Sequence, residues 1–227
     1  MGKGKLNKWN ENRTFGHVFE PTMQDIINGQ EFNKGIWHKE VFENDNPITL
    51  ELGCGKGEYT VALARKYPER NFIGIDIKGH RFWRGAKTSN EEGMKNVAFL
   101  RTRLEFINNS FAQDEVDELW ITFSDPQPKD DKGSKRITGP RFIDRYKKLL
   151  KPGSLINVKT DSTLLYEWSR DQYKEKGYTV LMNSDDVYGK LVNEVDDEMR
   201  EILNIKTYYE RRWLEEGKKI KFLRIQI

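Results

Sequence analysis

The chain has 227 residues and a net charge of +3; 36% of its residues are hydrophobic and 33% are charged. This length and composition suit one α/β domain with a sizeable core, and no apolar run approaches the roughly 20 residues that span a bilayer. The N-terminus lacks the apolar segment of a signal peptide and a single cysteine excludes an internal disulfide, so we expect a cytoplasmic protein. The cysteine and the three histidines show no metal-ligand spacing, so we expect no metal site.

The chain divides into a basic N-terminal arm, residues 1–20, which we expect to be mobile, and a single domain, residues 21–227. Short apolar runs alternate with helical patterns in the domain, which predicts a mostly parallel seven-stranded sheet with helices on both faces. The expected strands are Ile48–Leu52, Phe72–Asp76, Val97–Arg101, Leu119–Phe123, Leu155–Lys159, Tyr178–Met182 and Ile220–Ile225. The expected helices are residues 58–67, 81–92, 141–150 and 163–176, with Lys151-Pro152-Gly153 stopping the third helix and turning the chain into a strand. Residues 183–206 fit either a helix or a long loop.

Charge is unevenly distributed along the sequence. Residues 1–13, 129–148 and 206–224 carry net charges of +3, +5 and +4, whereas residues 185–201 carry −5. Segregated charge suits a face that binds a polyanion such as a nucleic acid, because phosphates must be neutralised. An ordinary patchy surface fits the same pattern equally well.

A glycine-rich turn follows the first expected strand. Ile48–Leu52 runs into Gly53-Cys54-Gly55-Lys56-Gly57 and then into a helical pattern, so the backbone can approach a ligand closely. The spacing differs from the dinucleotide fingerprint, and Glu58 occupies the helix start where a pyrophosphate would bind. Asp76 ends the next strand, where a carboxylate can accept hydrogen bonds from both hydroxyls of a ribose. Glu51 orients the turn, approaches the ligand, or only anchors the backbone.

A second motif follows the fourth expected strand. Phe123-Ser124-Asp125-Pro126-Gln127-Pro128-Lys129 places an aspartate between an apolar run and two prolines, and Lys135 and Arg136 follow it. Proline fixes its own φ and biases the preceding residue away from helical dihedrals, so this loop can hold Asp125 rigidly. The sequence therefore predicts a fixed carboxylate beside a basic loop.

Together these motifs resemble those of a known family. The glycine-rich turn resembles motif I of the class I S-adenosylmethionine-dependent methyltransferases, which have a Rossmann-like α/β fold. More specifically, the chain is similar to the bacterial tRNA (guanine-N7)-methyltransferases of the TrmB type over roughly residues 10–225. The segments that carry the similarity, in family order, are Glu51–Gly57, Phe72–Asp76, Phe123–Lys129, Lys135–Thr138, Leu150–Gly153, Lys159–Asp161 and Thr207–Glu210.

The resemblance implies methyl transfer from S-adenosylmethionine to N7 of a guanine in the tRNA variable loop. The cofactor contacts that it implies are Glu51, Gly53, Gly55, Gly57, Asp76, Arg103 and Asp125, with Asp125 also catalytic. The implied substrate contacts are Lys129, Lys135, Arg136, Asp161, Thr207, Tyr208, Tyr209 and Glu210, with Lys135 and Arg136 meeting phosphates. Guanine N7 carries a lone pair and needs no deprotonation. We therefore hypothesise that Asp125 holds the N1–H and N2–H₂ edge and stabilises the charge that grows on the ring, without acting as a general base.

Some positions depart from the family pattern. Gln127 stands where the family usually has tryptophan, and Asp130-Asp131 where it has a more basic run, so the grip of this loop on the substrate is expected to differ. Arg103 stands where relatives often carry an acidic or amide residue near the adenine. The N-terminal arm is expected to fold onto tRNA with Trp9 stacking on a base or ribose, or to be disordered without function.

Two alternative functions stay open. The first is a methyltransferase that acts on another nucleophile, such as an exocyclic amine. Asp-Pro-x-Pro loosely resembles the Asp/Asn-Pro-Pro-aromatic motif of amino-methyltransferases, although Gln127-Pro128 breaks that pattern. A non-catalytic RNA-binding relative is the other alternative, and the intact Glu51, Asp76, Asp125 and Asp161 argue against it. Cytosine C5 methylation is disfavoured because Cys54, the sole cysteine, lies in the glycine-rich turn rather than at a nucleophile position. A monomer and a homodimer fit the sequence equally well.

Overall fold

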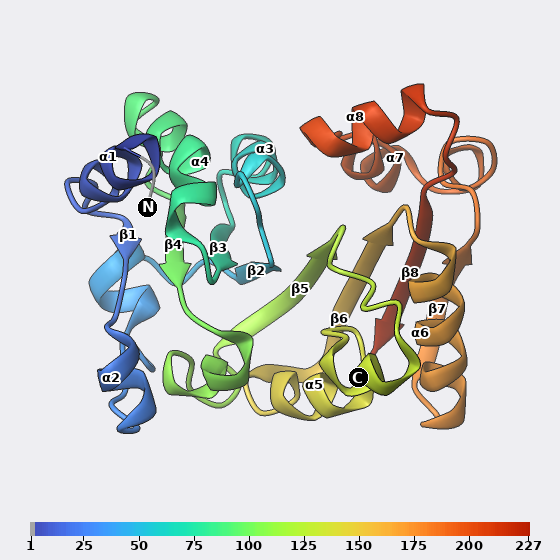
Figure 1. The fold of residues 1–227 in the computed structure, drawn as a ribbon, viewed down its shortest axis with the longest axis horizontal. Coiled ribbons are helices and arrows are strands. Elements are labelled where there is room, and N and C mark those ends of the chain that lie inside the picture. Colours follow the sequence, from blue (N-terminus) through green and yellow to red (C-terminus); the bar gives the residue numbers. More distant parts are fainter. Residues whose placement is uncertain (1–2) are drawn as a thin grey trace.

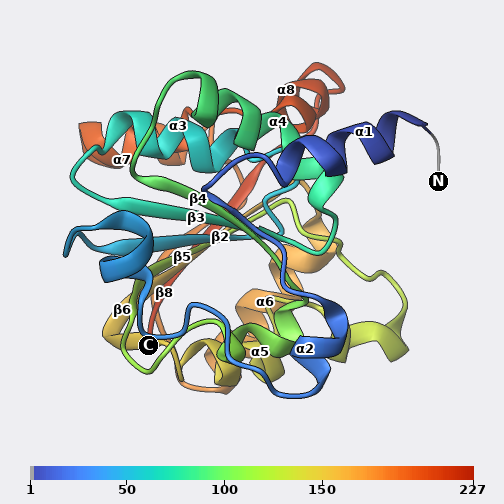
Figure 2. The same cartoon turned by 90° about the vertical axis from the view of Figure 1, so that its left-hand side faces the viewer.

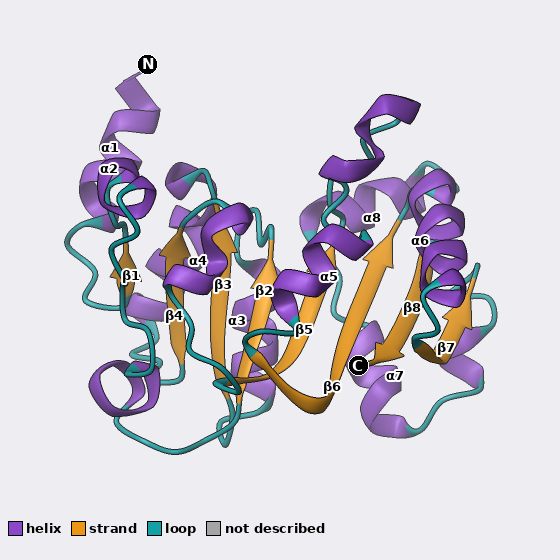
Figure 3. Cartoon of the chain, turned by 90° about the horizontal axis from the view of Figure 1, so that it is seen from below, coloured by secondary structure: helices purple, strands orange, loops and turns teal. Residues whose placement is uncertain are grey.

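The computed structural model describes residues 3–227, apart from the side chains of Lys3, Met23 and residues 130–132. One eight-stranded sheet of order β1-β4-β3-β2-β5-β6-β8-β7 runs through the molecule (Figure 1 and Figure 3). Strands β1 to β6 are parallel, whereas β8 lies antiparallel between β6 and β7. The strands are β1 (Val18–Phe19), β2 (Ile48–Leu52), β3 (Asn71–Asp76), β4 (Val97–Arg101), β5 (Val116–Thr122), β6 (Leu150–Thr160), β7 (Thr179–Ser184) and β8 (Lys221–Gln226).

Helices cover both faces of the sheet (Figure 2). One face carries α1 (Lys3–Asn12), α3 (Glu58–Lys66), α4 (Gly79–Glu91), α7 (Asp197–Leu203) and α8 (Tyr208–Glu215), and its core includes Tyr59, Phe82 and Met199. The other face carries α2 (Met23–Ile27), α5 (Pro140–Tyr146) and α6 (Thr163–Glu175), and its core includes Trp37 and Tyr146. Shorter helical segments are Trp37–Phe42, Leu104–Asn109, Asp130–Lys135 and Leu191–Asn193.

The centre of the sheet decides where a ligand can bind. All of β2 is buried, as expected for a parallel strand that is covered by helices on both faces. It pairs with β3 from Ile48↔Asn71 to Leu52↔Ile75 and with β5 on its other side. The strand order reverses between β2 and β5, so the loops that follow these strands diverge and leave a crevice at the carboxyl ends.

The expected parallel sheet wrapped by helices is confirmed, but the predicted number of seven strands is wrong. Val18 and Phe19 pair with Phe99 and Leu100 of β4 and add an eighth strand at the edge. The preceding residues also differ from the mobile arm that we expected. Residues 3–12 form α1, which packs on α4 and is tied to it by an ion pair of 2.8 Å between Glu11 and the Lys87 ammonium.

The expected turn at Lys151-Pro152-Gly153 lies inside a strand. Helix α5 ends at Tyr146, earlier than predicted, and Leu150 already pairs with Val116 of β5. The register then shifts, because Glu118 pairs with Leu155 and the residues between form an irregularity in β6. Gly153 has a φ of +82°, and its N–H donates a hydrogen bond of 2.7 Å to the Ile227 carbonyl. Backbone pairing therefore continues through a segment whose residue types predict a turn. Residues 183–206 combine the end of β7, a short helical segment and α7.

Candidate active site

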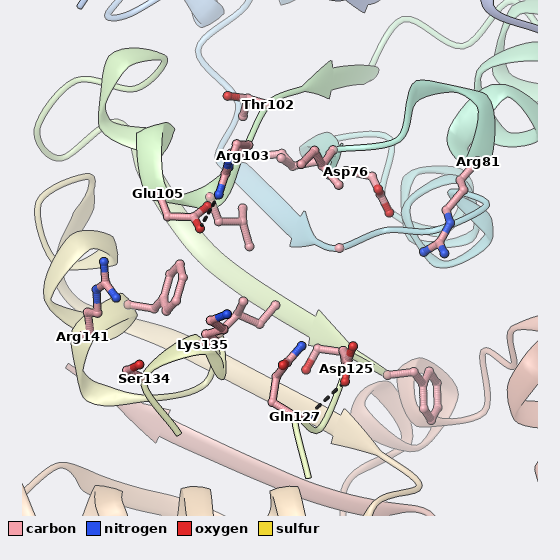
Figure 4. Close-up of a pocket in the computed structure, with 18 residues that line it drawn as sticks. Asp76, Arg81, Thr102, Arg103, Glu105, Asp125, Gln127, Ser134, Lys135 and Arg141 are labelled. Carbon is pink, nitrogen blue, oxygen red and sulfur yellow. Dashed lines mark hydrogen bonds and ion pairs between the residues drawn. The ribbon is translucent and has the colours of Figure 1, made fainter. Parts of the chain in front are cut away.

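A cleft of about 480 Å³ opens at the carboxyl ends of β3, β4 and β5 (Figure 4). Its walls come from four loops, and each loop follows an element that the central sheet positions. Gly53 contributes the start of the glycine-rich turn, Asp76 the end of β3, Arg103 the segment after β4, and Asp125 and Lys135 the loop after β5. The structure therefore brings the two predicted carboxylates, Asp76 and Asp125, into one cavity.

The glycine-rich turn requires glycine for a steric reason. Gly57 precedes α3 with a φ of +71°, and a Cβ there would lie 2.6 Å from the Phe99 ring. Gly53 has a φ of +75° and lines the cleft directly. Gly53 thus presents bare backbone to the cavity, whereas Gly55 and Gly57 are absent from its lining as the described residues form it.

Asp76 is held in one orientation by backbone donors. The Gly55 N–H donates 3.1 Å to its Oδ2, and the Lys78 N–H donates 2.8 Å to its Oδ1. Burial raises the pKa of this carboxyl, while these hydrogen bonds and the nearby Arg81 oppose the rise. Each oxygen keeps further acceptor capacity toward the cleft, so Asp76 can receive a pair of hydroxyl groups.

Glu51 lies beneath the turn and is absent from the lining of the cleft as the described residues form it. Its Oε2 accepts hydrogen bonds from the Thr60 N–H at 2.9 Å and from the Thr60 hydroxyl, and its Oε1 accepts one from the Thr122 hydroxyl. Burial raises the pKa of Glu51 to about 7. Of the roles expected for Glu51, orientation of the turn is the one that these contacts support.

Two residues with strained backbone dihedrals flank Asp125. Phe123 and Gln127 have φ values of 52° and 45°, a region that bulky residues rarely adopt. The Gln127 N–H donates 2.9 Å to Asp125 Oδ1, which closes a local turn. The Asp125 side chain is exposed and borders the cleft, so its free oxygen is available to a ligand.

Arg136 supports this loop from inside the protein. It is only 4% exposed. Its guanidinium donates 3.0 Å to each of the Pro126 and Gln127 carbonyls and stacks 4.6 Å from the Trp168 ring centroid. Arg136 therefore braces this loop from within, and its burial argues against the phosphate contact expected for it.

Other predicted residues divide between the cleft and its surroundings. Arg103 lines the cleft and pairs with Glu105 at 3.2 Å, and Lys135 lines it as well. Lys129 is exposed on the same loop, outside the cleft lining as described. Asp161 lies at the end of β6, where its carbonyl accepts 2.8 Å from the Lys221 ammonium. The side chains of Asp130 and Asp131 lie outside the described residues.

The cleft also holds polar groups that the sequence analysis missed. The hydroxyl oxygens of Thr102 and Ser124 are buried, line the cavity and have no hydrogen-bond partner within the described part of the chain. Buried hydroxyls without partners are costly, so they mark where a bound molecule would bond. The only sequence signal for these two residues was their position, because each follows the end of a parallel strand.

The predicted segment Thr207–Glu210 begins α8, and its members have different roles. Thr207 caps the helix by accepting from the Glu210 N–H at 3.2 Å, and the Glu210 carboxylate completes a capping box. Glu210 is fully buried and forms an ion pair of 2.7 Å with Lys159, which is also fully buried. A side chain in this position cannot touch a substrate while α8 is folded, so the burial of Glu210 argues against the contact expected for it.

Tyr208 and Tyr209, in contrast, are exposed beside the glycine-rich turn. The Tyr208 N–H donates 3.0 Å to the Glu58 carboxylate, and the Lys56 ammonium lies 3.7 Å from the Tyr208 ring centroid. Both tyrosines are about half exposed, at 48% and 52%. They can therefore meet a large ligand at the mouth of the site.

Among the side chains that the structure describes, no group of acidic, histidine or cysteine residues has the arrangement of a metal site. None of the helices in the described part of the chain is long and apolar enough to cross a membrane.

Comparison with known proteins assigns the family. A family model described as a putative methyltransferase matches residues 45–223. The tRNA (guanine-N(7)-)-methyltransferase of Bacteroides fragilis is 49% identical over 99% of this chain and 86% of its own length, and that of Porphyromonas gingivalis is 51% identical over 92% and 84%. The crystal structure of the 16S rRNA methyltransferase KamB shares the fold, with a TM-score of 0.63 and 17% identity over 87% of this chain and 95% of KamB. The chain therefore belongs to the tRNA (guanine-N(7)-)-methyltransferase family.

Proposed function

We propose that this protein transfers a methyl group from S-adenosylmethionine to N7 of a guanine in tRNA, within the bacterial cytoplasm. One observation carries the proposal beyond family membership. Asp76 and Asp125, which come from the carboxyl ends of β3 and β5, border the same cleft of about 480 Å³. A cavity of this size suits a cofactor together with the edge of one base.

The residues present fit the cofactor. Asp76 is oriented to accept from two ribose hydroxyls, Gly53 leaves room for close approach, and the unpartnered hydroxyls of Thr102 and Ser124 offer further bonds. Arg103 borders the same region and is paired to Glu105, so it contributes shape more than free charge. When bound, S-adenosylmethionine supplies an electrophilic methyl group.

Asp125 prepares the acceptor. Its carboxylate accepts hydrogen bonds from the guanine N1–H and N2–H₂, which fixes the base with N7 toward the methyl donor. The same negative charge stabilises the positive charge that develops on the ring as N7 is alkylated. The N7 lone pair needs no base to free it, so Asp125 positions and polarises without removing a proton. The hydrogen bond from the Gln127 N–H to Oδ1 holds the carboxylate in place.

The tRNA contacts divide by exposure. Lys135, Lys129, Tyr208 and Tyr209 are accessible around the mouth of the cleft, and we propose that they contact tRNA. Asp161 and Thr207 lie at the same carboxyl-end side of the sheet, where Thr207 serves α8 and Asp161 keeps its carboxylate available.

Methyl transfer to an unmodified tRNA transcript tests the proposal. We expect label from a methyl-labelled cofactor to appear in 7-methylguanosine after nucleoside analysis. Asp125→Asn is expected to lower kcat/KM by about 100-fold, because the lost charge faces the growing positive charge. The exposed Asp171→Asn on α6 serves as a matched control and should leave kcat/KM unchanged. Label on an exocyclic amine would overturn the function, and near-normal turnover of Asp125→Asn would overturn the role of Asp125.

A further inference from the structure

A second hollow, of about 390 Å³, lies beside the cofactor cleft. It is bounded by α1, by the link from β3 to α4 and by the end of β4, and it shares Ile77 and Arg81 with the cleft. Its charged side chains are Lys5, Lys78, Arg81 and Arg101, and no acidic residue lines it among those described. We call this feature the basic hollow.

The cations of the basic hollow are not held in ion pairs among the described side chains. The Glu20 carboxylate lies at the edge of the hollow, where it accepts a hydrogen bond from Trp9 Nε1. Asp76 lies nearby, but it lines the neighbouring cleft and accepts from the Lys78 backbone. His80 lines the same hollow, and its pKa is lowered first by burial and then by the positive charges of Lys5, Arg81 and Lys78. Cations gathered in a concave surface create a field that attracts an anion.

The hollow is also built in advance of any ligand. The Arg101 guanidinium stacks 4.4 Å from the Trp9 ring centroid, and its Nε donates 3.3 Å to the Ile77 carbonyl. Trp9 is fixed in turn, because its Nε1 donates 2.7 Å to the Glu20 carboxylate. Asn12 is fully buried and donates 2.9 Å to the Gly79 carbonyl, which anchors α1 to the start of α4. Arg101 therefore loses little conformational freedom when an anion binds here.

We propose that the basic hollow binds backbone phosphates of the tRNA, next to the nucleotide that occupies the cofactor cleft. This inference rests on the proposed function, because it needs a tRNA nucleotide in the cleft with which the hollow shares Ile77 and Arg81. In an RNA chain the ribose of each internal nucleotide is linked to a phosphate on either side. A guanine in the cleft therefore brings these anions to the neighbouring surface. Trp9 thus supports Arg101 from behind, which differs from the base-stacking role expected for a free arm.

Exchange of two cations tests the site. We would compare Lys5→Gln/Lys78→Gln with Lys174→Gln/Lys176→Gln, a control that removes the same charge from exposed lysines at the end of α6. Equilibrium binding of end-labelled tRNA would be measured without cofactor over a range of salt concentrations. One phosphate contact contributes a salt slope of about 0.7 to 0.9, which at 0.1 M salt corresponds to about fivefold to eightfold in affinity. The hollow variant is therefore expected to lose about 25-fold to 60-fold in affinity and about 1.5 in slope.

The remaining measurements separate this inference from the proposed function. Cofactor affinity and the single-turnover methylation rate at saturating tRNA should be unchanged in the hollow variant, and Lys5→Arg/Lys78→Arg should restore tRNA affinity. Equal losses in both glutamine pairs would show a general charge effect and overturn the site, as would wild-type affinity in the hollow variant. Wild-type protein that binds tRNA through the hollow but labels no N7 would overturn the proposed function and leave the site standing.

Discussion

The buried carboxyl group of Glu51 predicts an unusual dependence of stability on pH. Burial raises its pKa from 4.5 to about 7, although hydrogen bonds from Thr122 and Thr60 oppose the rise. Between these two pH values the folded protein binds a proton that the unfolded chain has released. Glu51 therefore makes its full contribution to folding stability below pH 4.5, and this contribution is lost as the pH rises through 7.

The size of this effect follows from the two pKa values. The rise from 4.5 to about 7, at about 1.4 kcal/mol for each pH unit, amounts to about 3 kcal/mol in total. About 2.5 kcal/mol of this falls between pH 5 and pH 8. Glu51→Gln keeps an acceptor for Thr60 and a donor for Thr122 but cannot ionise. We therefore expect Glu51→Gln to gain about 2.5 kcal/mol of unfolding free energy over wild type between these two pH values.

Urea unfolding at pH 5 and pH 8 without ligands measures this difference directly. Other ionisable groups are present in both proteins, so their contributions cancel in the comparison. The exposed Glu69→Gln is the matched control and should show a constant offset from wild type. If the offset of Glu51→Gln is also constant, the carboxyl titrates alike in the folded and unfolded chain and the argument fails. A gain at pH 5 relative to pH 8 would reverse the sign and refute it as well.

Further predictions concern elements around the cleft. Glu210→Gln should lower the unfolding free energy by about 3 kcal/mol in urea, because it leaves the buried Lys159 ammonium without its carboxylate. Gly57→Ala should lower the unfolding free energy by about 3 kcal/mol in the same assay, because the new Cβ meets the Phe99 ring and the φ is left-handed. Gly93→Ala is the control, since its φ is similar but its surroundings are open, and it should cost about 1 kcal/mol. Arg136→Lys loses one of the two bonds to loop carbonyls, so we expect single-turnover methylation to slow about tenfold and the unfolding free energy to fall by about 1 kcal/mol.

The parallel core and its strand ends were predictable because local and tertiary preferences agree there. Ile48–Leu52 and Val97–Arg101 are strands with the predicted bounds, since a short apolar run followed by a turn has few other stable arrangements. Asp76 and Asp125 follow from the same logic, because polar residues after parallel strands meet at one edge of the sheet. The positions of these side chains thus depend on features that lie close together in the sequence.

The roles of Arg136 and Glu210 were not predictable from charge and motif order, because burial is a tertiary property. Arg136 is buried by Trp168, a residue far along the chain, and Glu210 by its ion pair with Lys159 of β6. A partial signal was available for Glu210, since Thr207 three residues earlier predicts a capping box. Lys159 at the end of an apolar run was a second signal that a carboxylate partner would be needed.

The antiparallel insertion of β8 sets an order in which the sheet can be completed. β7 pairs with β8 and not with β6, so residues 179–184 cannot join the sheet until residues 221–226 have left the ribosome. Until then β6 presents an unpaired edge that includes the apolar residues Ile156 and Val158. Unpaired strand edges are prone to pair with other chains. Delays in translation between β7 and β8 are therefore the period in which this protein is most exposed to aggregation.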